Sequence, residues 1–416
     1  MLNLNLNFDP KLIALQKEAL REIRPFFAGI EEIAQANTLK VLNAFRECQV
    51  SEHHFQESTG YGYHDLGREK LDEVWAKIFG AEKALVRSQF VSGTHALACV
   101  LFGLLRPGDE LVSAAGAPYE TLRTVIGSAK PTKGSLKEIG VAYREIPLTE
   151  SGADIEGLKK CLTPNTKMVF IQRSRGYSLR PPLSIGEIKK ICAAAHEIRP
   201  EIICFVDNCY GEFVEALEPT AVGADIIAGS LIKNPGGGLA AQGGYIAGRA
   251  DLVELASYRL TAPGLGSHLG ASPAGSRLFF QGLFLAPHVV SQALKGALFA
   301  ASLFDKLGYL TFPKFHETRH DIVQAIELKS PAKMLAFCRG LQQYSPVDAH
   351  VTPIPGDLPG YSGPVVMAGG TFIQGSSIEL SADGPLAEPY VIYLQGGLHF
   401  EHAMLGALGA ANCLLE

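Results

Sequence analysis

The chain has 416 residues, of which 47% are hydrophobic and 19% charged, and its formal net charge is −5. This length suits two or three domains with a large core. The weakly acidic balance leaves no basic stripe for binding nucleic acid, and no apolar run approaches the roughly 20 residues of a membrane span. We therefore expect neither nucleic acid nor membrane as a partner.

The cysteines and the first residues indicate the compartment. The eight cysteines are scattered and form no CxxC pair, which argues against a metal site and against a disulfide framework. Free thiols are typical of a reducing compartment. The first twelve residues lack the basic start and long apolar core of a signal peptide. These features predict a cytoplasmic protein without a bound metal.

The first 60 residues are predicted to form an N-terminal helical arm. Asp9 and Pro10 are a good N-cap and first-turn pair, and apolar residues recur at helical spacing in two segments, 11–23 and 30–48. The arm carries no catalytic signal. We expect it to pack on the rest of the chain or to contact another subunit.

From residue 61 to about 285, predicted strands alternate with predicted helices. The strands are 83–88, 109–114, 140–146, 167–174, 201–208 and 224–232, and the helices are 68–80, 93–105, 118–128, 153–162 and 184–198. This alternation predicts an α/β domain whose mainly parallel sheet has helices on both faces. Ligands of such sheets gather at the carboxyl ends of the strands.

The pattern changes near residue 286. A long helix, 287–308, is followed by short β-like segments and a final helix, 399–415. The β-like segments are 349–355, 364–374, 377–383 and 390–397. Residues 286–416 are therefore predicted to form a smaller α+β domain with antiparallel pairing.

Lys233 stands at the end of the apolar stretch 224–232 and directly before Asn-Pro-Gly-Gly-Gly. An apolar run of this length indicates a buried strand, and the Gly/Pro cluster indicates a sharp loop. Lys233 is either a loop lysine that reaches water or a reactive amine in a pocket, where a dry environment lowers its pKa. The spacing alone does not separate these alternatives.

Three other polar features lie at the ends of predicted strands. Ser92, Gly93 and Thr94 open a helix, and this start either binds an anion such as phosphate or only caps the helix. Asp207 ends an apolar strand, where it either caps the next segment or faces a cation. Ser230 precedes Lys233 by three residues and offers a hydroxyl to a phosphate.

Each feature is common alone, but their order in the chain is not. A phosphate cup, an acid for the pyridinium nitrogen and a Schiff-base lysine are the groups that pyridoxal 5'-phosphate requires. They occur here in that order on an alternating chain with a small C-terminal domain. The sequence therefore predicts pyridoxal 5'-phosphate as cofactor.

Six motifs give the chain a family resemblance. It resembles the fold-type-I enzymes of the cystathionine/methionine gamma-lyase family that use pyridoxal phosphate, and most of all their aluminium-resistance, or methionine gamma-lyase-like, branch. The resemblance runs from about Tyr61 to the C-terminus. It implies a large domain with a seven-stranded, mainly parallel sheet and a smaller C-terminal domain. The motifs are 59–87, 116–122, 205–215, 229–248, 258–266 and 391–398.

The resemblance implies roles for individual residues. Lys233 would carry the cofactor as a Schiff base, and Asp207 would pair with its ring nitrogen. Tyr119 would stack on the ring and assist as an acid. The phosphate would be held by Ser92, Gly93, Thr94 and Ser230, and by Tyr61 from a neighbouring subunit. Tyr63 is a further candidate for binding the cofactor. The alternative is that Tyr61 and Tyr63 are loop tyrosines that pack on the N-terminal helices.

The chain also departs from the family's usual pattern. Tyr63 stands where the lyases have an arginine, and Arg68 is a candidate for the missing charge. Gln395 lies in the region of the arginine that binds the substrate carboxylate. Arg173 and Arg175 are candidates to replace it, because they share one face if their strand continues that far. The alternative is that both are solvated loop arginines.

The resemblance implies a carbon–sulfur lyase that acts on a sulfur-containing amino acid by β- or γ-elimination, giving a keto acid, ammonia and a thiol. It further implies a homo-oligomer with sites shared in dimers, assembled into a tetramer. Two alternatives stay open. One is another reaction with the same cofactor, such as aldol cleavage or transamination. The other is a non-catalytic stress or sensor protein that binds the cofactor.

Overall fold

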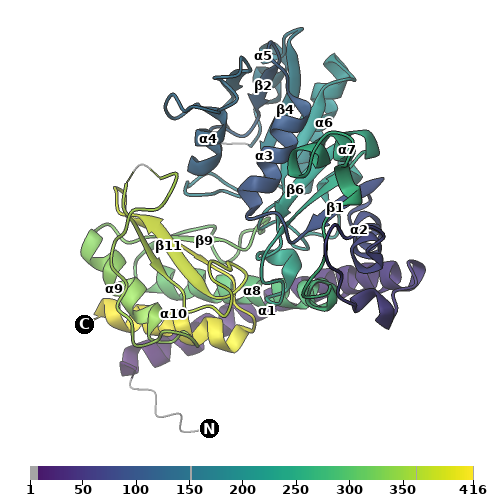
Figure 1. The fold of residues 1–416 in the computed structure, drawn as a ribbon. Helices are drawn as coiled ribbons and strands as arrows, with labels where there is room; N and C mark the ends of the chain where they lie inside the picture. Colours follow the sequence, from purple (N-terminus) through teal and green to yellow (C-terminus); the bar gives the residue numbers. More distant parts are fainter. Residues whose placement is uncertain (1–7, 150–151, 362, 416) are drawn as a thin grey trace. The chain divides into compact units, whose positions relative to one another are not determined.

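The computed structural model describes residues 8–149, 152–361 and 363–415, which form two compact units (Figure 1). The large unit is Ile33–Pro287, and the small unit joins the chain before residue 33 to the chain from His288 onward. The three-part division expected from the sequence, 1–60, 61–285 and 286–416, stays a prediction about domains. The first seven residues, part of the stretch tested for a signal peptide, lie outside the described residues.

A seven-stranded sheet forms the centre of the large unit, in the order β1-β7-β6-β5-β4-β2-β3. All neighbours are parallel except β7, which runs antiparallel to β6 and β1. The predicted fold class, with its mainly parallel sheet, is confirmed. The strands are β1 Lys83–Arg87, β2 Glu110–Ser113, β3 Ala142–Glu145, β4 Thr166–Gln172, β5 Ile203–Asp207, β6 Ile226–Ser230 and β7 Gly244–Gly248.

Helices cover both faces of this sheet. Ile203 and Phe205 of β5 share one apolar core with α3 and α7, while Cys204, on the opposite face, contacts Cys192 of α6. Alternate residues of a buried strand thus feed two helical layers. The helices are α2 Leu66–Phe79, α3 Gly93–Leu104, α4 Glu120–Ile126, α5 Ile155–Cys161, α6 Ile185–Ile198 and α7 Ala250–Leu260.

Two long helices, α1 Pro10–Glu47 and α8 Arg277–Lys306, have residues in both units. The sequence predicted two helices in place of α1, but the helix continues through Pro25. Helix α8 begins ahead of the predicted residue 287, and it alone in the described chain is long and apolar enough to cross a membrane. Because 72% of its most apolar window is buried, α8 has the character of a core helix in a soluble protein.

The small unit contains a five-stranded antiparallel sheet in the order β10-β11-β12-β9-β8, as the predicted α+β class requires. Helices α9 Pro331–Gln342 and α10 Phe400–Leu415 pack against each other. The predicted strand 349–355 is wrong, and two strands after α8 were not predicted. The strands are β8 Leu310–Phe312, β9 Gln324–Glu327, β10 Val365–Ala368, β11 Ser381–Pro385 and β12 Val391–Gln395.

The register of the large sheet brings the predicted site residues together at the carboxyl-terminal ends of its central strands. Gln172 at the end of β4 lies beside Asp207 at the end of β5, and Asp207 lies beside Ala228 of β6. Ser230 ends β6, and Lys233 follows three residues later. Three neighbouring parallel strands therefore place polar groups side by side at their carboxyl ends.

Candidate active site

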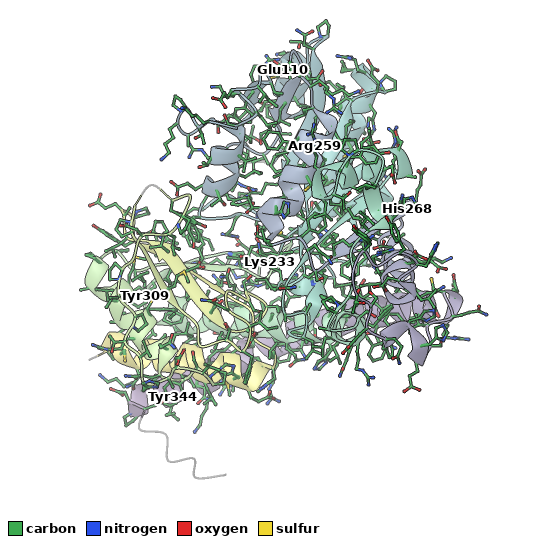
Figure 2. All side chains as sticks on the ribbon, in the orientation of Figure 1. Glu110, Lys233, Arg259, His268, Tyr309 and Tyr344 are labelled. Atoms are coloured by element: carbon green, nitrogen blue, oxygen red, sulfur yellow. The ribbon has the colours of Figure 1, made fainter. Side chains whose placement is uncertain are left out.

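Lys233 lies in the sharp turn after β6 (Figure 2). The Gly236 N–H donates to the Lys233 carbonyl at 3.2 Å, and Asn234 Nδ2 donates to the Glu212 carbonyl at 3.0 Å. A Cβ at Gly236 would lie 1.8 Å from the Leu231 carbonyl oxygen, so only glycine fits this turn. The glycine loop read from the sequence therefore fixes the backbone of the lysine.

Asp207 is almost fully buried at the end of β5, with a side chain 4% exposed. Its Oδ1 accepts the N–H of Cys209 at 3.1 Å. Burial raises the pKa of this carboxyl, and the smaller effect of the nearby Lys233 amine opposes it. A buried carboxylate of this kind needs a cation, and the amine or a protonated ring nitrogen would serve.

The start of α3, here called the α3 cup, has the backbone geometry that suits an anion. Ser92 Oγ accepts the N–H of His95 at 3.1 Å, and the Ser92 carbonyl accepts that of Ala96 at 3.3 Å. The N–H groups of Gly93 and Thr94, one step earlier in the helix, remain for an anion. A Cβ at Gly93 would lie 3.0 Å from that of Ser230, so glycine lets this hydroxyl approach the helix start. The hydroxyl of Ser92 serves as the helix cap.

Tyr119 connects the cup to the strand ends. Its hydroxyl lies 2.9 Å from Thr94 Oγ1, and its backbone N–H donates to Gln172 Oε1 at 2.8 Å. Burial, reinforced by the charge of Asp207, raises the pKa of the Tyr119 phenol. The phenol therefore stays protonated near neutral pH.

The pKa of Lys233 differs from the sequence-based expectation. Burial lowers it, as expected for a dry site, but interactions with Cys209, Tyr210 and Asp207 outweigh that effect and raise the pKa well above its ordinary value. These interactions favour the ammonium form of the amine.

The contacts of Arg173 bear on the prediction that it binds the substrate carboxylate. Its side chain is fully buried, Nη1 donates to Asn208 Oδ1 at 2.8 Å, and Nη2 pairs with Glu215 at 3.0 Å. Glu218 lies 3.6 Å from Nη1. A guanidinium held by two carboxylates inside the fold favours a structural role for Arg173 over binding of a substrate carboxylate.

Arg175 lies beyond the end of β4 and is buried. The strand does not continue to this residue, so the argument that placed both arginines on one face fails. Arg175 alone stays a predicted ligand of the substrate carboxylate.

The two loop tyrosines lie on the surface of the large unit. Tyr61 is 71% exposed and Tyr63 is 61% exposed, with ring centroids 5.5 Å apart. Arg68 is buried below them and donates to the carbonyls of Gly62 at 2.7 Å and Gly270 at 3.0 Å. Arg68, the candidate to replace the positive charge of the family's arginine, thus holds the loop that carries the two tyrosines. The roles of the tyrosines in a neighbouring subunit's site stay predictions.

Three residues of this region were not found from the sequence. Tyr210 contacts the Lys233 amine, Gln172 holds Tyr119, and Glu212 lies beneath the lysine turn. Glu212 accepts the Tyr245 hydroxyl at 2.8 Å on Oε1. The motif 205–215 contains both Tyr210 and Glu212, but only the backbone turn after β5 shows which way they face.

One further cluster of residue types that bind metals lies near the amino-terminal ends of β5 and β6. His196, Cys204 and Asp225 place ligand-type atoms within 4.8 Å of one another. His196 Nε2 lies 3.0 Å from Asp225 Oδ2, and the same oxygen accepts the Cys204 N–H at 2.8 Å. These contacts already account for the cluster as a link between α6 and the strands.

The site residues fit pyridoxal 5'-phosphate. The cup offers N–H groups and a hydroxyl to a phosphate, the buried Asp207 suits a protonated ring nitrogen, and the amine of Lys233 suits an aldehyde. Tyr119 adds an aromatic face held at both ends. This arrangement on an alternating sheet is that of a fold-type-I pyridoxal-phosphate enzyme.

Comparison with known proteins places the chain more closely. Residues 12–415 match the family model of methionine gamma-lyase. The uncharacterized protein YnbB of Bacillus subtilis is 50% identical over 408 residues, 97% of each chain. The structure of a carbon–sulfur lyase involved in aluminium resistance from Clostridium novyi is similar, with a TM-score of 0.94, 48% identity and coverage of 98% and 96%. The structure of a candidate cystathionine beta-lyase involved in aluminium resistance from Listeria monocytogenes is also similar. Its TM-score is 0.93 and its sequence identity 51%, and the match covers 96% of this chain and 99% of the Listeria chain.

The chain belongs to the methionine gamma-lyase family, as the resemblance implied. Its cofactor is pyridoxal 5'-phosphate, and its general class is that of a lyase dependent on this cofactor.

Proposed function

We propose that this protein is a carbon–sulfur lyase that cleaves a sulfur-containing amino acid by β- or γ-elimination to a keto acid, ammonia and a thiol. The observation that carries the proposal is the meeting of Lys233, Asp207 and the α3 cup at one edge of the sheet. The names of two relatives support this reaction, since the Clostridium novyi protein is called a carbon–sulfur lyase and the Listeria protein a candidate cystathionine beta-lyase.

Lys233 has two tasks in this proposal. It would hold the cofactor through Nζ, and once the substrate amine has taken its place, the same Nζ would take the proton from the substrate Cα. For the second task the amine must be neutral. Cys209, Tyr210 and Asp207 raise the pKa of the amine, so a ring nitrogen that engaged Asp207 would remove one of the interactions that favour the ammonium form.

Other side chains orient the reaction and complete it. When bound, pyridoxal phosphate supplies an electron sink for the Cα carbanion. Asp207 would keep the ring nitrogen protonated, and Gly93, Thr94 and Ser230 would hold the phosphate. The phenol of Tyr119, which keeps its proton near neutral pH, would donate it to the leaving sulfur as negative charge develops there.

The proposal includes a cytoplasmic homo-oligomer. The exposure of Tyr61 and Tyr63 on the large unit supports a contact with a second copy, which the family resemblance also implies. Arg175 is proposed as the group that binds the substrate carboxylate.

Product analysis with a panel of sulfur-containing amino acids tests the reaction. The holoprotein should release keto acid, ammonia and thiol in equal amounts, and Lys233→Ala should be slower by about 10²-fold or more, since general-base catalysis contributes that much. Aldehyde with glycine would instead indicate aldol cleavage, and keto acid without ammonia would indicate transamination. Bound cofactor with no turnover of any substrate would favour the sensor role and contradict the proposal.

A further inference from the structure

Tyr210 is the residue that the Lys233 amine touches. Nζ lies 4.0 Å from the centroid of the Tyr210 ring. This distance is well inside the roughly 6 Å at which an ammonium is attracted by the face of an aromatic ring. Among the residues that the structure describes, none gives this amine a hydrogen bond or an ion pair. The ring face is therefore its direct partner.

The backbone holds the ring in an unusual way. Tyr210 has a φ of 69°, in the left-handed region that bulky residues rarely adopt. The turn around it is closed by two contacts: the Gly211 N–H donates to the Asn208 carbonyl at 3.0 Å, and the Cys209 N–H donates to Asp207 Oδ1 at 3.1 Å. Strained conformations of this kind persist where the surrounding structure enforces them, often at functional sites.

The turns of Tyr210 and Lys233 are also tied to each other. Asn234, next to the lysine, donates through Nδ2 to the carbonyl of Glu212, two residues after the tyrosine, at 3.0 Å. Asn234 and Glu212 are both buried. The separation of ring and amine is therefore set by a fixed link between the two turns and does not depend on the flexible lysine side chain alone.

We propose that the Tyr210 ring is a docking place for the Lys233 amine, which occupies it when the amine carries its proton and is not bonded to the cofactor. This inference rests on the proposed function, in which Lys233 alternates between a bonded and a free state. Tyr210 acts as a positioning residue. It keeps the free amine close to the reacting atoms and favours its ammonium form until the proton is needed elsewhere.

Three variants of the full-length protein test the proposal. Tyr210→Phe keeps the ring face, whereas Tyr210→Leu removes it and keeps an apolar side chain. Tyr210→Asn also removes the ring and suits the left-handed backbone, so it serves if the leucine variant does not fold. The cofactor is removed with hydroxylamine and dialysis. The rate at which added pyridoxal phosphate bonds to Lys233 is then followed by absorbance across a range of pH.

The proposal predicts that wild type and Tyr210→Phe share one pH midpoint for this rate. Without the ring the ammonium loses its cation–π partner, so the midpoint should fall by roughly half a pH unit or more. An unchanged midpoint in the leucine and asparagine variants would overturn the proposal, and so would a phenylalanine variant that behaves like them.

Borohydride reduction of each holoprotein distinguishes a failure of the proposed function from a failure of the role proposed for Tyr210. Failure to trap the cofactor on Lys233 in the wild type would contradict the proposed function itself. Trapping in every variant, with no shift in the midpoint, would contradict only the role of Tyr210.

Discussion

Two buried carboxyl groups near the lysine turn, those of Asp207 and Glu212, differ in their polar partners. Asp207 has the Lys233 amine nearby, and its pKa is raised mainly by burial. Glu212 accepts a hydrogen bond from Tyr245, but its Oε2 has no hydrogen-bond partner in the described part of the chain. Burial raises the pKa of Glu212 to about 8. Glu212 is therefore a protonated carboxylic acid near neutral pH.

Replacing Glu212 by Gln should change how stability depends on pH. Between its ordinary pKa of 4.5 and the folded value of about 8, the folded chain keeps a proton that the unfolded chain releases, so rising pH destabilises the wild type. Glutamine has no such proton. Urea unfolding should show Glu212→Gln gaining at least about 1 kcal/mol relative to wild type between pH 5 and pH 8.

A control variant at a surface carboxylate completes that experiment. Glu156 is exposed on α5, so Glu156→Gln should keep a constant difference from wild type across the same pH range. If Glu212→Gln behaves in the same way as this control, the buried Glu212 is not protonated at neutral pH.

Polar residues of the site were predictable where an apolar run ends. Asp207 and Lys233 each follow a buried strand, and parallel strands bring such ends together. The environment of each side chain was less predictable. Arg173 and Arg175 looked equivalent in the sequence, but only the folded chain shows that two carboxylates enclose Arg173. Tyr210 could not be found because its orientation depends on a left-handed backbone residue.

At the scale of elements, Arg173 joins the end of β4 to the segment after β5. Its guanidinium reaches Asn208, the residue after Asp207, and the carboxylates of Glu215 and Glu218. A Cβ at Gly211 would lie 2.4 Å from Arg173 Cδ, so the turn after β5 wraps closely around this side chain. The arginine therefore supports the strand end that carries Asp207.

Arg173→Met should destabilise the protein strongly. Removing one partner of a buried ion pair leaves uncompensated charge inside the fold, which costs about 3–5 kcal/mol. Arg173→Lys should recover part of this loss, because it keeps the charge without the fork geometry. Denaturant unfolding measures both effects. A methionine variant as stable as wild type, with weaker binding of the substrate, would restore Arg173 as a substrate ligand.

The sheet itself was predictable in part. The six strands β1 to β6 were predicted from apolar runs between helices, whereas β7 was missed because its short run follows a glycine loop and pairs antiparallel. In the small unit, β8 and β9 were missed, since strands of three and four residues carry little periodicity. Helix α1 was predicted as two segments, 11–23 and 30–48, but it is continuous and contains Pro25.

At the scale of the whole molecule, the site is proposed to be shared between subunits. Tyr61 belongs to the exposed pair on the large unit and is predicted to reach the phosphate of a neighbour's cofactor. Mixing the inactive variants Tyr61→Ala and Lys233→Ala should therefore restore activity, because each mixed dimer contains one intact site. About a quarter of the wild-type activity is expected from statistical exchange of subunits.

Light scattering gives the control for this experiment. The holoprotein should be larger than the 44.6 kDa chain, and both variants should keep the same assembly. A fully assembled mixture that stays inactive would show that each subunit builds its site alone.

The central claim is that Lys233 carries the cofactor. The most direct test is reduction of the yellow holoprotein with borohydride, followed by proteolysis and mass spectrometry of the labelled peptide. The account predicts a single phosphopyridoxyl label, on Lys233, and none in Lys233→Ala. A label on another lysine, or a wild-type protein that stays colourless and unlabelled with added pyridoxal phosphate, would contradict it.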